Sequence, residues 1–154
     1  MFASDSDRLR QQQQKYRRHT NSRHAFYADQ ERTLEIFYQE QLITLGCPMH
    51  LAGYRYLLRS LLFLSAHPEA LHQMTKILYP RIAAEENTSA GCVERSMRTA
   101  LEHIWPSGNR QLLDELLPTH AVAAAKNGSC GRRPSVSEFL AALLAHTTLQ
   151  RKNG

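Results

Sequence analysis

Residues 87–98, NTSAGCVERSMR, place an acid and two arginines on one side of a helical pattern. At 3.6 residues per turn, Val93 and Met97 fall on one face, whereas Glu94, Arg95 and Arg98 fall on another. Arginine can donate two hydrogen bonds to one guanine, and glutamate can accept one from a cytosine amine. The pattern fits a surface that reads nucleic-acid bases, and it also fits the ordinary solvated face of a helix.

The segment that precedes this helix has the spacing of a helix-turn-helix motif. Ala83 is small enough for close helix packing, Asn87 tolerates the left-handed conformation of the turn, and Val93 supplies an aliphatic contact. In such a motif the exposed start of the second helix meets base edges, and Ser89 with the free N–H groups of the first turn suits a phosphate. A three-point match also arises by chance, so the spacing alone leaves DNA binding open.

The composition restricts the class of protein. The chain has 154 residues, 42% of them hydrophobic, which is enough for one compact domain with a core. No run approaches the roughly 18 apolar residues of a membrane span, and we read no secretory signal at the start. Three cysteines without paired spacing favour reduced thiols and give no CxxC metal site. We expect a cytoplasmic protein with no metal, no cofactor and no membrane partner.

The net charge of +5 is concentrated at the N-terminus. Residues 1–24 hold six basic and two acidic residues, a formal charge of +4, and the remaining 13 basic and 12 acidic residues contribute +1. Residues 1–28 are also rich in Gln and poor in large aliphatic residues. This composition predicts a disordered basic arm, or a helix that forms only when docked. The arm is either a solvated tail without function or a segment that touches nucleic acid.

Residues 29–150 predict an all-α domain of six to seven helices, because apolar residues recur at helical spacing and strand-type alternation is absent. Gly53 lowers helix propensity and marks a close approach of another helix. Ser135 and Glu138 form a capping box at the start of the last helix. Residues 118–133 are expected to form a loop. The expected helices cover residues 30–45, 49–67, 68–79, 80–86, 89–105, 110–117 and 136–149.

One face of the expected 68–79 helix carries four apolar residues. They are Leu71, Met74, Ile77 and Leu78, and we expect this face to be buried. Pro80 then fits the first turn of the next helix, where its missing N–H costs nothing.

Several spaced motifs together are more specific than the helix-turn-helix spacing. GYRYL, TKILYP, VERSMR, the stretch at 105–109 and PSVSEFLA occur in this order. Over roughly residues 32–150 the sequence resembles the C-terminal DNA-binding domain of the stage zero sporulation protein A family, the master response regulators of endospore formation. The resemblance implies a helix-turn-helix transcriptional regulator that binds the major groove of double-stranded DNA.

The resemblance also implies roles for individual residues. By motif position, Glu94 and Arg95 reach bases in a short G- and C-containing box, and Arg98 contacts the duplex nearby. A basic residue just before the last helix lies near the DNA backbone in the family, and Arg133, with Arg132 beside it, matches that position. Family members bind boxes in tandem, so a homodimer or tandem binding on DNA is implied.

Three positions of the helix expected over residues 89–105 depart from the family pattern. Cys92 replaces an arginine, Gly91 replaces a residue that is usually serine, and Thr99 replaces a histidine. The first of these replacements removes a cation. Each lost phosphate contact is expected to lower the affinity for DNA and to reduce the slope of log affinity against log salt concentration by roughly one. The box sequence can therefore differ from that of the family, or specific binding can have decayed.

A fourth departure lies ahead of the domain. Family members carry a phosphoacceptor receiver domain there, and this sequence has only about 30 residues, without the alternating strand-and-helix pattern of a receiver. We expect no control by aspartyl phosphate within this chain.

The sequence gives no reason to expect an enzyme, because it lacks a GxSxG elbow, a glycine-rich phosphate loop and an HExxH motif. The serious alternative is a protein-interaction module, or a diverged paralogue that modulates a full-length regulator without reading DNA. A third interpretation is nonspecific binding of RNA or DNA through residues 8–23. Only specific DNA reading predicts that Arg95→Ala relaxes base preference.

Overall fold

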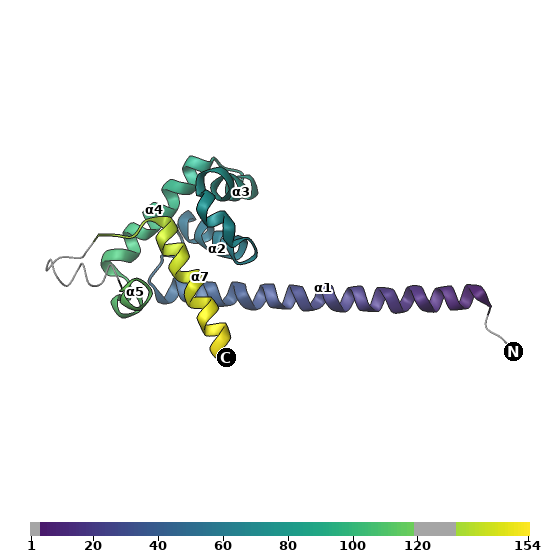
Figure 1. Cartoon of the computed structure of the whole chain (residues 1–154). Coiled ribbons are helices and arrows are strands. Elements are labelled where there is room, and N and C mark those ends of the chain that lie inside the picture. Colours follow the sequence, from purple (N-terminus) through teal and green to yellow (C-terminus); the bar gives the residue numbers. More distant parts are fainter. Residues whose placement is uncertain (1–3, 119–131) are drawn as a thin grey trace. The chain divides into compact units, whose positions relative to one another are not determined.

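The computed structural model describes residues 4–118 and 132–154, and it divides the chain into two compact units, Met1–Ile36 and Phe37–Gly154. The expectation of an all-α protein is confirmed, since the part of the chain that is described contains no strand. The expected loop at 118–133 lies almost wholly outside the described residues. The helices, labelled as in Figure 1, are α1 (Asp5–Thr44), α2 (Ala52–Ala66), the 3-10 helix η1 (Pro68–Gln73), the π-helix η2 (Met74–Leu78), α3 (Tyr79–Glu85), α4 (Ala90–Ser107), α5 (Arg110–Leu116) and α7 (Val136–Asn153).

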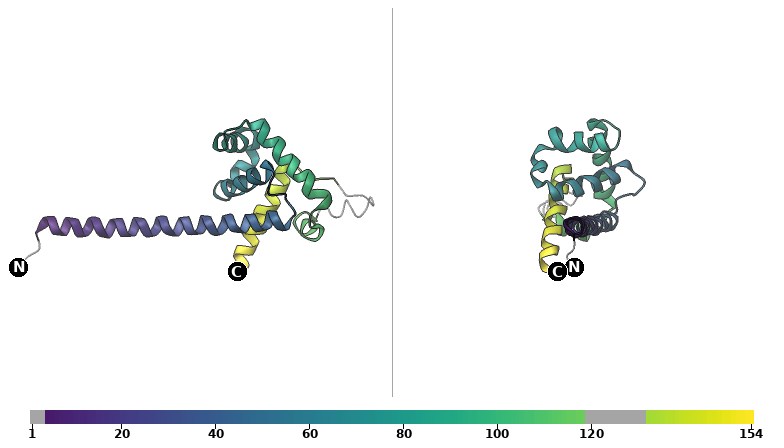
Figure 2. Two further views of the ribbon diagram at one scale, coloured as in Figure 1. Left: turned by 180° about the vertical axis from the view of Figure 1, so that it is seen from behind. Right: turned by 90° about the vertical axis from the view of Figure 1, so that its right-hand side faces the viewer.

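Unit Phe37–Gly154 contains the hydrophobic core. Helix α2 packs against both α4 and α7, and α3 packs against α4. The teal and green helices lie side by side in the views of Figures 1 and 2. The largest fully buried side chains come from these helices, from the C-terminal end of α1 with the residue after it, and from η2: Tyr38, Leu42, Leu45, Leu57, Leu61, Leu64, Leu78, Ile82, Met97, Leu101, Ile104 and Phe139. Helix α4 is therefore held along its length, and its orientation in this unit is fixed by the core.

The predicted close approach at Gly53 is confirmed. A Cβ atom built on Gly53 would lie 2.1 Å from the carbonyl oxygen of Ser96 and 2.8 Å from the Cβ of Ala100. Both of these residues belong to α4. The absence of a side chain at residue 53 thus lets α2 touch the backbone of α4.

The prediction of a single α-helix over residues 68–79 is wrong. The segment forms η1 and η2 instead of one α-helix, and the Tyr79 N–H donates to the Met74 carbonyl at its end. Pro80 explains the wider turn, because its ring would clash with the carbonyl four residues back in a regular α-helix. The expected buried face is changed as a result: Leu78 is buried, but Ile77 is 38% exposed.

Residues 5–28, expected as a disordered arm or as a helix that forms only when docked, are helical in the structure as part of α1. The physical reason is visible in the sequence, because residues 5–44 contain neither Gly nor Pro and are rich in Gln and Arg, which favour helices. Almost all described side chains of residues 4–36 are exposed. The domain boundary at residues 28 and 29 stays a prediction.

Glu86 joins α2 to the turn between α3 and α4. Its carboxylate accepts from the Nε atom of Arg55 at 2.6 Å and forms an ion pair with the Nε atom of Arg59 at 2.8 Å. The Glu86 side chain is only 10% exposed, whereas both arginines are more than half exposed. Sequence analysis missed this contact because Glu86 is 27 or more positions away from both arginines.

We expect Glu86→Gln to lower the free energy of unfolding by about 1–2 kcal/mol, because a partly buried carboxylate loses two charge-assisted partners. Glu85→Gln is the matched control. Glu85 pairs with Arg81 on the surface at 2.7 Å, and a surface pair of this kind contributes about 0.5 kcal/mol or less. Urea unfolding followed by the fluorescence of Trp105, the single tryptophan, measures both. Equal effects of the two substitutions would argue against the bridging role of Glu86.

Candidate nucleic-acid interface

Helices α3 and α4 with the turn between them form the expected helix-turn-helix. Asn87 adopts the left-handed conformation, with φ of 54°, and the Thr88 N–H donates to the Ala83 carbonyl at 3.0 Å. This is the hydrogen bond of a Schellman-type helix end. Ser89 then caps α4, since its hydroxyl oxygen accepts from the Cys92 N–H at 3.2 Å. The roles predicted for Ala83, Asn87 and Val93 agree with this geometry, because Ala83 and Val93 are both buried.

Helix α4 separates a buried face from an exposed one. The expected core positions Val93, Met97, Ala100 and Ile104 all have 0% exposure. Because the core fixes this face, the opposite side of the first two turns faces outward. Glu94 is half-buried there, and Arg95 and Arg98 are exposed.

The charged side chains of this outer face differ in how they are held. The guanidinium of Arg98 contacts the Glu94 carboxylate at 2.7 Å, one helical turn away. Such a pair holds the Arg98 side chain along the helix surface, although it adds only about 0.3–0.5 kcal/mol of stability. Arg95 forms no ion pair with any residue in the described part of the chain. Its guanidinium can therefore meet a ligand without first leaving an acidic partner.

Two hydroxyl groups predicted at the interface are engaged within the helix. The Ser89 oxygen is used as the cap, which leaves its O–H free to donate. The Thr99 hydroxyl donates to the Arg95 carbonyl at 3.0 Å. Thr99 can contact a phosphate only by giving up this bond, and its place in the interface stays a prediction.

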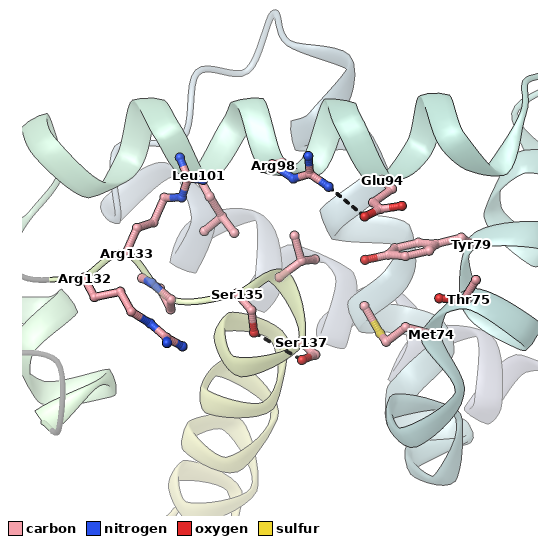
Figure 3. A pocket seen from close by; sticks show the side chains of 12 residues that line it. Met74, Thr75, Tyr79, Glu94, Arg98, Leu101, Arg132, Arg133, Ser135 and Ser137 are labelled. Atoms are coloured by element: carbon pink, nitrogen blue, oxygen red, sulfur yellow. Dashed lines mark hydrogen bonds and ion pairs between the residues drawn. The ribbon is translucent and has the colours of Figure 1, made fainter.

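A hollow beside α4 brings together further residues from the predicted set. Arg98 and Glu94 lie on one side of it, and Arg132 and Arg133 lie in the segment just before α7 (Figure 3). The hollow has a volume of about 420 Å³ and also contains Tyr79. Four of the seven predicted site residues therefore line one depression, whereas Ser89, Arg95 and Thr99 do not line it.

The charges around the hollow are balanced by acids. Arg133 contacts Glu102 at 2.9 Å, and Arg132 lies 3.6 Å from Glu138. With the pair formed by Arg98 and Glu94, each of the three cations faces a carboxylate. Phosphate binding here therefore requires that the guanidinium groups exchange an acidic neighbour for the phosphate, which limits the affinity that these contacts add.

Tyr79 belongs to this surface and was missed by sequence analysis. Its side chain is 7% exposed, and Figure 3 shows its hydroxyl directed into the hollow below Glu94 and Arg98. Burial raises the pKa of the Tyr79 hydroxyl, and the nearby Glu94 carboxylate raises it further. The group is therefore a neutral hydrogen-bond donor at neutral pH. Its position before Pro80 gave no signal that it would line the hollow.

Cys92, the first departure from the family pattern, is exposed on α4. Hydrogen bonds from Thr88 and Ser96 lower the pKa of the Cys92 thiol, and the positive charge of Arg95 lowers it further. By contrast, burial raises the pKa of the Cys47 thiol to about 12. The two thiols should therefore differ strongly in reactivity, since the thiolate is the nucleophile.

In a Cys130→Ser protein, we expect iodoacetamide at pH 7.5 to alkylate Cys92 rapidly and Cys47 only on unfolding. A duplex bound across the outer face of α4 should slow the reaction of Cys92, because Arg95 lies one turn from it. Mass spectrometry of proteolytic peptides measures both rates. Alkylation of Cys92 that a saturating duplex leaves unchanged would place the DNA away from this helix.

One known protein family matches most of this chain. The sequence model of the family described as "Sporulation initiation factor Spo0A C terminal" matches residues 39–147. The chain belongs to this family. It therefore contains the helix-turn-helix, DNA-binding effector domain of a sporulation transcription regulator, as the motifs predicted.

No described helix is both long and apolar enough to cross a membrane. No group of three or more His, Cys, Asp and Glu side chains within residues 4–118 and 132–154 is arranged to hold a metal ion.

Proposed function

We propose that this chain is a sequence-specific transcriptional regulator that reads a short duplex box with the outer face of α4. The observation that carries the proposal is that one face of the second helix of the helix-turn-helix presents exposed Arg95 and Arg98 beside half-buried Glu94, opposite a fully buried core face. The core holds α4 against rotation, so these side chains are presented to a major groove in one orientation.

The three side chains have different tasks in this proposal. Arg95 is exposed and has no described acidic partner, so it supplies the bidentate contact to a guanine. Glu94 accepts from a cytosine amine, while its second oxygen remains available to Arg98. Arg98 then contacts a base or the backbone beside the guanine. Family membership supports these assignments, which the resemblance of the VERSMR motif implies.

Backbone contacts come from both ends of the same surface. Ser89 and the free N–H groups of the first turn of α4 bind one phosphate. Arg133 and Arg132, in the segment just before α7, bind another once they leave Glu102 and Glu138. Cys92 replaces a cation of the family, so we expect a smaller salt dependence than a member with arginine there would show.

The proposal includes binding without aspartyl phosphate in this chain. A receiver is built from alternating strands and helices, and residues 4–36, ahead of the family match, are helical. DNA binding by the chain as given should therefore be the same before and after treatment with a small phosphoryl donor such as acetyl phosphate.

Selection from a pool of randomised duplexes tests the proposal. The wild-type chain is expected to enrich one short motif that contains G·C pairs, because Arg and Glu together specify G and C. Binding that persists through the selection without enrichment of a motif would leave only nonspecific attraction. No binding in any round would favour the protein-interaction module.

A further inference from the structure

Residues 5–36 of α1 form a helix whose large apolar side chains are exposed, apart from half-buried Leu34. Leu9, Tyr16 and Tyr27 are 58%, 74% and 61% exposed. A single helix without a packed face is marginally stable in water, because most helical stability in proteins comes from tertiary packing. Large exposed side chains on such a helix point to a partner that covers them.

One stripe of side chains along this helix has nearly the same sequence in both directions. Positions 9, 13, 16, 20, 23, 27, 30 and 34 alternate in steps of four and three, which is the heptad spacing of a face that packs on another helix. In order they hold Leu, Gln, Tyr, Thr, Arg, Tyr, Gln and Leu. The same positions taken in the opposite order give the same residue types, except that Thr20 and Arg23 change places.

This symmetry specifies what a second copy would present. An antiparallel copy in this register places Leu9 opposite Leu34, Gln13 opposite Gln30, and Tyr16 opposite Tyr27. Like side chains thus meet at every position except the centre, where Thr20 faces Arg23. Every contact occurs twice, as the two-fold symmetry of an isologous interface requires.

The charge distribution along α1 selects the antiparallel direction. Residues 5–24 contain six basic and two acidic residues, a formal charge of +4. Residues 25–44 contain one basic residue, Arg32, and the four acids Asp29, Glu31, Glu35 and Glu40, a formal charge of −3. A parallel pair would place like halves together, whereas an antiparallel pair places the basic half of each helix against the acidic half of the other.

The column beside the stripe carries the same complementarity at the level of single residues. Arg10, Arg17, His24 and Glu31 follow one another there at intervals of seven residues. In an antiparallel two-fold pair this column faces its own copy, so Arg10 lies opposite Glu31 of the second copy and Arg17 lies opposite His24.

We propose that residues 9–34 are a self-association surface through which two copies of this chain pair as antiparallel helices. The pairing needs no DNA, which distinguishes it from the tandem binding that the family resemblance implies. The two Gln pairs within the stripe limit the stability of the dimer and fix its register, as single polar residues do in coiled coils. The dimer therefore contains two copies of α4, one from each chain.

Site-directed cross-linking of the full chain tests the direction and the register. The background is Cys92→Ser with Cys130→Ser, and Cys47 is retained because it is buried, with 4% exposure. Gln13→Cys and Gln30→Cys are prepared separately in this background. We expect a disulfide-linked dimer when the two variants are mixed under mild oxidation, and little when either is oxidised alone. Self-linking of each variant without preference for the mixture would overturn the antiparallel arrangement.

Sedimentation equilibrium without DNA tests whether the stripe holds the dimer. Tyr16→Ala with Tyr27→Ala should raise the dissociation constant roughly tenfold or more, because two buried aromatic anchors are lost from each copy. Asn21→Ala with Ser22→Ala, off the stripe on the same helix, is the control and should have little effect. A wild-type chain that remains monomeric up to about 100 μM, or that pairs only when DNA is added, would overturn the proposal.

Discussion

Arg95→Ala is expected to weaken binding to the selected duplex by about 1–3 kcal/mol and to relax the preference at one G·C pair. The loss is large because Arg95 is exposed, has no ion-pair partner among the described residues, and is the arginine that the VERSMR motif assigns to base contact. Removing it leaves the fold intact, since the buried face of α4 is unchanged. Fluorescence anisotropy with a labelled duplex and its shuffled version measures affinity and preference together.

Two control variants make this result specific. Arg151→Ala removes one exposed arginine from the last turn of α7, outside the residues that the family matches, and should leave the preference unchanged. Lys15→Gln with Arg18→Gln, at positions off the self-association stripe and its flanking column, lowers the charge of the basic half of α1, and it should weaken binding to both duplexes by the same factor or have no effect. If Arg95→Ala behaves like Arg151→Ala, α4 does not read bases.

Gly53→Ala is expected to lower the free energy of unfolding by about 1–3 kcal/mol, because an added Cβ atom would overlap the Ser96 carbonyl. The overlap is with backbone, which cannot rotate away, so α2 and α4 must separate. Since α4 carries the reading residues, the same change should also weaken binding to the selected duplex. Urea unfolding monitored by Trp105 fluorescence measures the stability.

Gly91→Ala is the matched control for the glycine substitution. Gly91 lies in the first turn of α4, and a Cβ atom there meets nothing within 4 Å. Alanine should therefore be neutral or stabilise the protein by up to about 1 kcal/mol, from helix propensity alone. Equal destabilisation by the two substitutions would indicate that the effect at Gly53 is not steric.

Helix starts and core faces could be predicted because their signals are local. Ser89 and Ser135 cap α4 and α7 as their sequences indicate, and the capping box between Ser135 and Glu138 is complete. The buried face of α4 followed from apolar spacing, and the left-handed turn from Asn87. These features depend on residues within about one helical turn of each other, and such features can be read from a single sequence.

Other features depend on contacts between distant segments or on competing effects of neighbouring residues. The Glu86 bridge joins residues far apart in sequence, and the position of Tyr79 in the hollow depends on how α3 packs against α4. Periodicity alone could not show that the turn before Pro80 widens, which left Ile77 exposed. On α1, low hydrophobicity predicted disorder, whereas helix propensity without Gly or Pro favours the helix that the structure has.

A double-mutant cycle between Arg95 and one guanine tests the central claim most directly. Each guanine of the selected motif is replaced in turn by 7-deazaguanine, which lacks the N7 acceptor, and affinity is measured for the wild-type chain and for Arg95→Ala. The account predicts one guanine whose replacement weakens wild-type binding clearly and Arg95→Ala binding hardly at all, with a coupling energy of about 1–3 kcal/mol. Coupling near zero at every guanine would contradict base reading by this helix.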